Sequence, residues 1–238
     1  MNKLNGLLLL GVVLAITSSF TFTDKNVSGK TFCYQTIKSD EVAKGLIEAL
    51  KVGATNSADK ASKTDGFYKN ADIFIPFPQD AIKVKNALEK VGVKKPVKEF
   101  ELSMNRAAEE ASKKALPILL DAIKGITFSD AMSILKGSND AATTYLKGKT
   151  KANLQVVFKP IVKEAIAKVK VTKYWENVAT AYNKVNVLSK GKKVDPDLES
   201  YITNKAIDGL FVLIAKEEVQ IRENPAARVT DLLKKIFN

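Results

Sequence analysis

The hydrophobic pattern divides the chain into a short apolar leader and a long region of helical periodicity. Residues 7–16 form an apolar run that follows Lys3 and precedes a stretch rich in Thr and Ser. This order is typical of a cleavable secretory signal, and the run is too short to span a bilayer. We therefore expect residues 1–23 to be a signal peptide, residues 24–38 to be a flexible lead, and the protein not to be transmembrane after signal cleavage.

From Ser39 onward, apolar positions recur at helical spacing. Ser39 is a suitable N-cap, and the helix that it opens should end at the Asp65–Gly66 turn. Further helices are expected over residues 81–91, 96–115, 118–123, 129–136, 140–147, 150–165, 174–185, 196–223 and 226–237. Their limits come from glycines and prolines: Gly92, Gly137 and Gly148 should end helices, and Pro117 and Pro160 should kink or split them.

Residues 72–78 break the helical rhythm. Pro76 and Pro78 hold the residues before them extended, and the isoleucines and phenylalanines between residues 73 and 77 carry enough apolar surface to pack across helices. We predict an extended strap there, with a short edge strand and a proline-rich partner ligand as alternatives. The chain shows no internal repeat and no linker after Ser39, so the pattern predicts one all-α domain over residues 39–238.

Charge and composition argue against several classes of function. The net charge is +12, but only Arg106, Arg222 and Arg228 of the 38 basic residues are arginine. Nucleic-acid readers favour arginine for its bidentate fork, so we expect no nucleic-acid partner. The chain has no histidine and one cysteine, Cys33, which excludes histidine-based triads and thiolate metal clusters. We expect no metal and no cofactor, and a free or intermolecularly paired thiol at Cys33.

The remaining candidate chemistry lies in acidic residues beside apolar helix faces. On a helix, Glu217 should fall inside the apolar face of residues 206–221, while Glu218 should sit at its edge and pair with Arg222. A buried carboxylate needs a partner, and Arg106, Arg228 or a lysine would serve for Glu217.

A second candidate helix carries Asn105 and Glu109 on the flank of its apolar stripe, with Arg106 and Glu110 paired nearer to solvent. Three interpretations follow: structural ion pairs, a pocket for a small polar or anionic ligand, or a carboxylate-dependent hydrolase using Glu217 or Glu109. The full candidate set is Asn105, Arg106, Glu109, Glu217, Glu218, Arg222, Arg228 and Asp231.

Two surface features add candidate partners. Residues 147–173 hold eight lysines against one acid, Glu164, which gives a local charge of +7 (eight minus one). This run is either a solvated face or a weak contact for an anionic lipid or polysaccharide. Trp175 and its neighbouring tyrosines predict either a half-buried helix junction or a sugar-stacking surface.

Several motifs, taken in order, resemble an uncharacterised bacterial family, domain of unknown function 4197. They are "GLIEALKVGATNS", "DGFYKNADIFIPFP", "MNRAAEEA", "DAMSILKGSNDAATTYLKGKT", "FKPIV" and "KAIDGLFVLIAKEEVQIRENPAARVTDLLKKIFN". The resemblance implies an exported helical protein of Gram-negative bacteria and supplies no catalytic residues. Where the family often mixes arginine and lysine, this chain has lysine, as at Lys147 and Lys149.

Together these observations predict an exported, periplasmic protein that binds a small ligand or an envelope partner without catalysis. The ground for this prediction is the scarcity of catalytic groups. The carboxylate-dependent hydrolase is the alternative.

Overall fold

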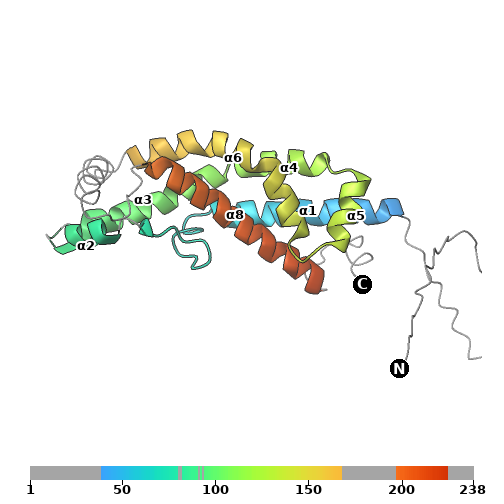
Figure 1. Cartoon of the computed structure of the whole chain (residues 1–238), viewed down its shortest axis with the longest axis horizontal. Coiled ribbons are helices and arrows are strands. Elements are labelled where there is room, and N and C mark those ends of the chain that lie inside the picture. The colour runs from blue at the N-terminus through green and yellow to red at the C-terminus, as the bar shows by residue number, and fades with distance from the viewer. Residues whose placement is uncertain (1–38, 80–81, 91, 93, 168–196, 225–238) are drawn as a thin grey trace, which may run out of the picture. The chain divides into compact units, whose positions relative to one another are not determined.

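The computed structural model of the protein describes residues 39–79, 82–90, 92, 94–167 and 197–224. The chain divides into two compact units, Met1–Thr36 and Ile37–Asn238, and every described residue lies in the second. The described helices are α1 (Ser39–Ser62), α2 (Ile82–Lys90), α3 (Lys94–Ser112), α4 (Ala115–Lys124), α5 (Phe128–Lys136), α6 (Ala141–Ala167) and α8 (Leu198–Glu223) (Figure 1). No strand occurs in these ranges, which confirms the all-α prediction.

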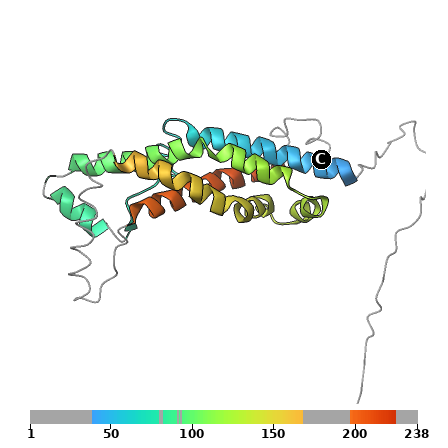
Figure 2. The same cartoon turned by 90° about the horizontal axis from the view of Figure 1, so that it is seen from above.

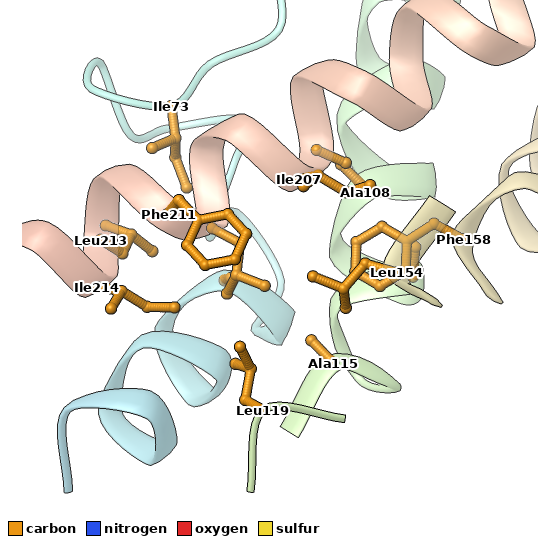
Figure 3. Close-up of a cluster of buried hydrophobic side chains, with 14 of the residues drawn as sticks. Ile73, Ala108, Ala115, Leu119, Leu154, Phe158, Ile207, Phe211, Leu213 and Ile214 are labelled. Carbon is orange, nitrogen blue, oxygen red and sulfur yellow. The ribbon is translucent and has the colours of Figure 1, made fainter. Parts of the chain in front are cut away.

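Four long helices, α1, α3, α6 and α8, enclose the core. Helix α8 packs against α6, α1 and α3, and α6 also packs against α3 (Figure 2). Side chains from α3, α4, α6, α8 and the 72–78 segment meet in one hydrophobic cluster (Figure 3). Because each buried large aliphatic or aromatic side chain stabilises the fold by roughly 1.5–3 kcal/mol, this cluster is what holds the helices together.

The strap prediction is confirmed, and its backbone is held by a side chain instead of a strand. Ile75 and Phe77 of the extended part are buried, and the buried Ile73 lies in the turn at residues 71–73 that precedes it. The Asn105 amide of α3 accepts from Ile75 N at 2.8 Å and donates to Ile75 O at 3.0 Å. Tyr201 of α8 donates to the Pro76 carbonyl oxygen at 3.0 Å. These bonds satisfy buried backbone groups that would otherwise need a neighbouring strand.

The turn before the strap lies where the sequence placed it. Asp65 has a φ of 67°, a left-handed conformation that Asp tolerates better than most residues. A methyl group on Gly66 would lie 2.3 Å from the Lys60 carbonyl oxygen, so only glycine fits there. Pro117 also acts as expected, because α3 ends at Ser112 and α4 begins at Ala115 with Pro117 in its first turn.

The prediction of two helices at 140–147 and 150–165 is wrong, because α6 runs unbroken from Ala141 to Ala167. Gly148 lies inside the helix, where it lowers stability by only about 1 kcal/mol, and the hydroxyl of Thr150 donates to Leu146 O at 2.7 Å instead of capping. Buried side chains recur every four residues along α6: Ala142, Leu146, Thr150, Leu154, Phe158, Val162 and Ile166. Each such step rotates the buried face by about 40°, so the stripe winds around the helix, and packing on α3 and α8 outweighs the glycine signal.

The predicted helices at 174–185 and 226–237, together with Trp175, lie outside the described residues. None of the described helices is long and apolar enough to cross a membrane.

The close approach of α8 to the segment 66–78 makes Gly209→Ala a test of the fold. A methyl group at Gly209 would lie 2.7 Å from Phe67 Cε1 and 3.1 Å from Ile73 Cβ. We expect the variant to lose roughly 1–2 kcal/mol of unfolding free energy, since overpacking exceeds the gain in helix propensity. Chemical denaturation of the wild type and the variant would measure this loss of unfolding free energy.

Gly53→Ala on α1 is the matched control, because its methyl group would lie 3.5 Å from Glu217 Cβ, an ordinary contact. Its stability should rise by up to about 1 kcal/mol. Equal effects of the two substitutions would contradict the packing of α8 on Phe67.

Candidate functional site

Glu218 of α8 acts as the N-cap of another helix. Its Oε1 accepts from Ala142 N at 3.1 Å, and its Oε2 accepts from Thr143 N at 2.9 Å and from Thr143 Oγ1 at 2.8 Å. Helix α6 has no acidic residue in its first turn, so this carboxylate from α8 satisfies backbone donors that α6 leaves unpaired. The negative charge also complements the positive N-terminal end of α6.

Arg222, one turn along α8, completes the group that we call the α8 cluster: Ile134, Ala142, Thr143, Glu218 and Arg222. Its Nε and Nη2 donate to Glu218 Oε1 at 3.1 and 2.8 Å. Nη2 also donates to the Ile134 carbonyl oxygen of α5 at 3.1 Å. The side chains of Arg222 and Glu218 are only 12% and 6% exposed, so the ion pair is buried, and both carboxylate oxygens of Glu218 accept hydrogen bonds.

The predicted burial of Glu217 and Glu218 is reversed, whereas the predicted pair of Glu218 with Arg222 is confirmed. Glu218 continues the buried row Ile207, Phe211, Ile214 and Ile221, whose steps alternate between four and three residues. That spacing averages 3.5 residues and matches the seam between packed helices better than a straight 3.6-residue wheel does. The Glu217 side chain, 14% exposed, turns toward α1.

On α1, Glu217 accepts from Asn56 Nδ2 at 2.9 Å and forms an ion pair with Lys60. The partner of Glu217 is therefore a lysine, which was one of the three expected alternatives. Arg106, another of them, pairs with Asp65 and Glu109 instead. Lys60 is 59% exposed, so this interaction is a solvent-facing link between α1 and α8.

A small cavity adjoins the α8 cluster, and its volume limits the size of any ligand that could bind there. It is lined mostly by apolar side chains of α1 and α8, together with Glu218 and Arg222, and its volume is about 20 Å³. That is room for one water molecule and not for an organic ligand, whose sites usually measure about 300–1,000 Å³. Within the described part of the chain, the α8 cluster therefore leaves no room for an organic ligand.

A second group on α3, the α3 clamp (Asn105, Arg106 and Glu109), holds the turn and the strap. Glu109 Oε1 accepts from Phe67 N at 3.1 Å and from Tyr68 N at 3.2 Å, while Arg106 Nη1 donates to Glu109 Oε2 at 2.6 Å. Both carboxylate oxygens of this buried residue are used by backbone or guanidinium donors. The clamp therefore replaces the regular backbone pairing that residues 66–77 lack.

Arg106 pairs with Glu109 and Asp65 instead of Glu110, which corrects the expected pair. Its Nη2 donates to Asp65 Oδ1 at 2.6 Å, and Glu110 pairs with Lys113. Hydrogen bonds from Lys69 and then Arg106 hold the pKa of Asp65 below its ordinary value of 3.8, and the bond to Glu109 raises the pKa of Arg106. Arg106 also lies 5.8 Å from the centroid of the Tyr68 ring.

The structure thus splits the candidate set between two clusters. Asn105, Arg106 and Glu109 lie in the α3 clamp, and Glu218 and Arg222 lie in the α8 cluster with Glu217 beside it. Arg228 and Asp231 lie outside the described residues. The sequence reasoning missed Thr143, Asp65 and Lys60. Asp140 stands immediately before α6 as a local cap candidate, so nothing in the sequence indicated that a distant carboxylate caps this helix.

Four lysines follow one row of four-residue steps along α6, which Gln155 interrupts: Lys147, Lys151, Lys159 and Lys163. Lys149 lies on the other flank of the helix, over the Tyr145 ring. Lys147 pairs with Asp208 at 2.9 Å, and Lys159 and Lys163 lie 3.8 Å from Asp197 and Glu199 of α8. Beside this lysine row lie two adjoining depressions of about 380 and 460 Å³, which are shallow, widely open to solvent and meet at Gln155. We call this surface the α6 trough; its lining is Thr144, Lys147, Gly148, Lys151, Ala152, Gln155, Val156, Lys159, Pro160, Lys163 and Glu199.

Comparison with known proteins adds a family. The model of the family described as protein of unknown function (DUF4197) matches residues 36–238. The chain belongs to this family. The match includes every described helix and both clusters, and the family description assigns no reaction. No curated protein and no solved structure matches the chain. Within the described part of this DUF4197 protein, no group of acidic, histidine or cysteine side chains could hold a metal ion.

Glu218→Gln should destabilise this DUF4197 protein far more than Glu217→Gln. Removing the charge of Glu218 leaves Arg222 buried without its counter-ion, which costs about 3 kcal/mol. Glu217→Gln removes a pair whose lysine is largely exposed, which costs less than about 1 kcal/mol. Urea unfolding of both variants tests the reversal, and an equal or larger loss for Glu217→Gln would refute it.

The pH dependence of the stability of Asp65→Asn tests the ion pair between Asp65 and Arg106 of the α3 clamp. Asn accepts the left-handed backbone of this position but carries no charge. Because the folded-state pKa of Asp65 is lowered, its contribution is present above the unfolded value and is lost as pH falls through the folded value. The stability difference between wild type and variant should therefore be largest at neutral pH and should shrink below about pH 4. Asp121→Asn, at an exposed pair with Lys124, should show a smaller difference at neutral pH.

Proposed function

We propose that this protein is an exported, non-catalytic binding protein whose α6 trough holds an anionic envelope polysaccharide. The observation that carries the proposal is the trough itself, an elongated hollow edged by lysines over a floor of small side chains. The N-terminal signal pattern of residues 1–23 supports export, and the lysine-rich composition supports an anionic partner.

The state of the carboxylates argues against the hydrolase alternative. Both oxygens of Glu109 accept hydrogen bonds from backbone or Arg106, and Glu217 is held by Asn56 and Lys60. The two residues share no contact residue and belong to separate groups. A glycoside hydrolase needs two carboxyl groups facing one cleft across the scissile bond, so this arrangement favours scaffolding over acid–base chemistry.

The shape of the trough favours a chain-like ligand. Gly148, Ala152, Val156 and Pro160 follow one another at four-residue steps, so they form a row along one face of α6. Lys151 and Lys163 lie about 18 Å apart along the helix axis, since each residue rises 1.5 Å. Regularly spaced ammonium groups beside a shallow floor suit the repeated charges of a linear polymer.

The lysines of the trough remain available although some are paired. Lys159 and Lys163 are 50% and 68% exposed, and their distances to the α8 acids are 3.8 Å. Exposed pairs of this kind contribute about 0–1 kcal/mol and exchange readily with other anions. A polyanion would therefore displace α8 carboxylates at little energetic cost.

A bilayer is the less suitable anionic partner. Peripheral membrane helices insert large apolar side chains, whereas Val156, 75% exposed, is the single large hydrophobic residue that the described part of this face exposes. The other floor residues are too small to reach into a lipid layer. The proposal therefore commits to a polysaccharide.

Binding to dextran sulfate, compared with neutral dextran, tests the proposal. The full chain should bind dextran sulfate with an affinity that falls steeply with salt, because ion pairs at an exposed surface are screened. The triple variant Lys151→Ala, Lys159→Ala, Lys163→Ala should weaken binding at least about tenfold, since each removed charge contributes about 1 kcal/mol.

The matched control removes three exposed lysines outside both lysine-lined surfaces, Lys114, Lys124 and Lys136, and should retain most of the affinity. Equal losses in the two triples would show that binding follows net charge and not the trough. Absence of dextran sulfate binding at low salt, or equal binding of neutral dextran, would overturn the proposal.

A further inference from the structure

The α2–α3 end of the domain carries a second concentration of positive charge. Residues 82–98 contain six lysines and one acid, Glu89, which gives a net +5 (six minus one). Lys85 is engaged, because it pairs with Glu101 at 2.7 Å and lies 5.9 Å from the centroid of the Phe77 ring. Lys94, Lys95 and Lys98 are exposed and form no ion pair with any other described residue. Three unneutralised ammonium groups therefore lie within the first five residues of α3.

These three lysines line one open groove. Lys94, Lys95, Lys98, Glu99 and Leu102 of α3 form the groove with Tyr68 from the turn after α1, and its volume is about 450 Å³. The groove is largely open to solvent, so a ligand in it would stay partly exposed. Three lysines and one glutamate give the lining a net charge of +2, which matches the charge of a phosphate monoester dianion.

The aromatic wall of the groove is held rigidly. Tyr68 N donates to Glu109 at 3.2 Å, which ties the Tyr68 backbone to the α3 clamp. The ring packs against Phe74 with the centroids 6.0 Å apart, and the Arg106 guanidinium lies 5.8 Å from the ring centroid. A side chain fixed in this way loses little conformational entropy when a ligand packs against it, which favours binding.

The placement of the lysines opposes helix stability. Helix α3 begins with Lys94 and Lys95 and has no acidic residue in its first turn. Cations at the positive end of a helix are unfavourable, by roughly 0.3–1 kcal/mol each, and the like charges also repel one another. A bound anion would remove this conflict. Local arrangements that oppose stability in an otherwise consistent fold commonly belong to functional sites.

We infer that this groove is a binding site for a phosphate monoester with an apolar body. The ammonium groups of Lys94, Lys95 and Lys98 hold the phosphate oxygens, as lysine does when it acts as a point charge. The Tyr68 ring and Leu102 contact the apolar body, and Glu99 is placed to accept a hydrogen bond from a ligand hydroxyl. The site lies on α3, apart from the α6 trough, so it stands independently of the polysaccharide proposal.

Phenyl phosphate is the probe, with inorganic phosphate for comparison, in calorimetric titrations of the full chain at low ionic strength. Phenyl phosphate should bind more tightly than inorganic phosphate, because only the ester contacts Tyr68 and Leu102. The triple variant Lys94→Ala, Lys95→Ala, Lys98→Ala should weaken phenyl phosphate binding at least about tenfold, since one charge-assisted hydrogen bond accounts for such a factor. Tyr68→Leu should reduce the preference for the phenyl ester and leave inorganic phosphate binding unchanged.

The α6 triple Lys151→Ala, Lys159→Ala, Lys163→Ala removes the same charge elsewhere and should leave phenyl phosphate binding within about twofold. Thermal melts confirm that both triples are folded, as expected for exposed lysines. No binding by the wild-type chain, or equal losses in the two triples, would overturn the inference.

Vesicles distinguish the source of the phosphate monoester. Phosphatidic acid presents a monoester, whereas phosphatidylglycerol presents a diester of the same sign. Binding to phosphatidic acid vesicles that excess phenyl phosphate displaces would identify a lipid headgroup, and binding to neither lipid would identify a soluble ester. Equal binding to both lipids that phenyl phosphate does not displace would contradict a monoester site.

Discussion

The buried carboxylate of Glu218 is the interaction on which the arrangement of α5, α6 and α8 depends. It caps α6 from another helix, and Arg222 links the same carboxylate to the last turn of α5. A capping residue within α6 would stabilise that helix alone, whereas this one makes the start of α6 depend on the position of α8. The start of α6, the helix that carries the proposed trough, is therefore tied to α8 by a buried ion pair in addition to the hydrophobic packing of α6 on α3 and α8.

The α3 clamp applies the same principle to an irregular segment. Asn105 and Glu109, one turn apart, take up backbone groups of residues 67, 68 and 75, so the turn and strap pack tightly without a strand partner. In both clusters the buried polar side chains serve backbone donors and acceptors. The carboxylate oxygens of Glu109 and Glu218 are therefore occupied by hydrogen bonds that hold the fold.

The sequence predicted what depends on local signals and missed what depends on packing between helices. Pro76 and Pro78 restrict the backbone of the residues beside them, so the strap was predictable. The ends of two helices were predictable as well, that of α1 at Ser62, shortly before the Asp65–Gly66 turn, and that of α8 at Glu223, next to Asn224. Gly148 was misread because a weak local preference gives way to a buried stripe that winds onto α3 and α8. Glu217 and Glu218 were exchanged because a difference of one residue on a helix depends on the packing seam, which no single helix encodes.

The division between arginine and lysine follows from the same geometry. Arg106 bridges Asp65 and Glu109 with two nitrogens, and Arg222 bridges Glu218 and a carbonyl oxygen of another helix. A single ammonium group cannot present two fixed donors in a plane, so lysine would leave one acceptor unsatisfied at either position. Lysine suits the α6 trough and the α3 groove, because a flexible, hydrated cation can follow an anion without a fixed geometry. The described arginines therefore hold the fold, and substitutions of surface lysines can test binding while the two clusters stay intact.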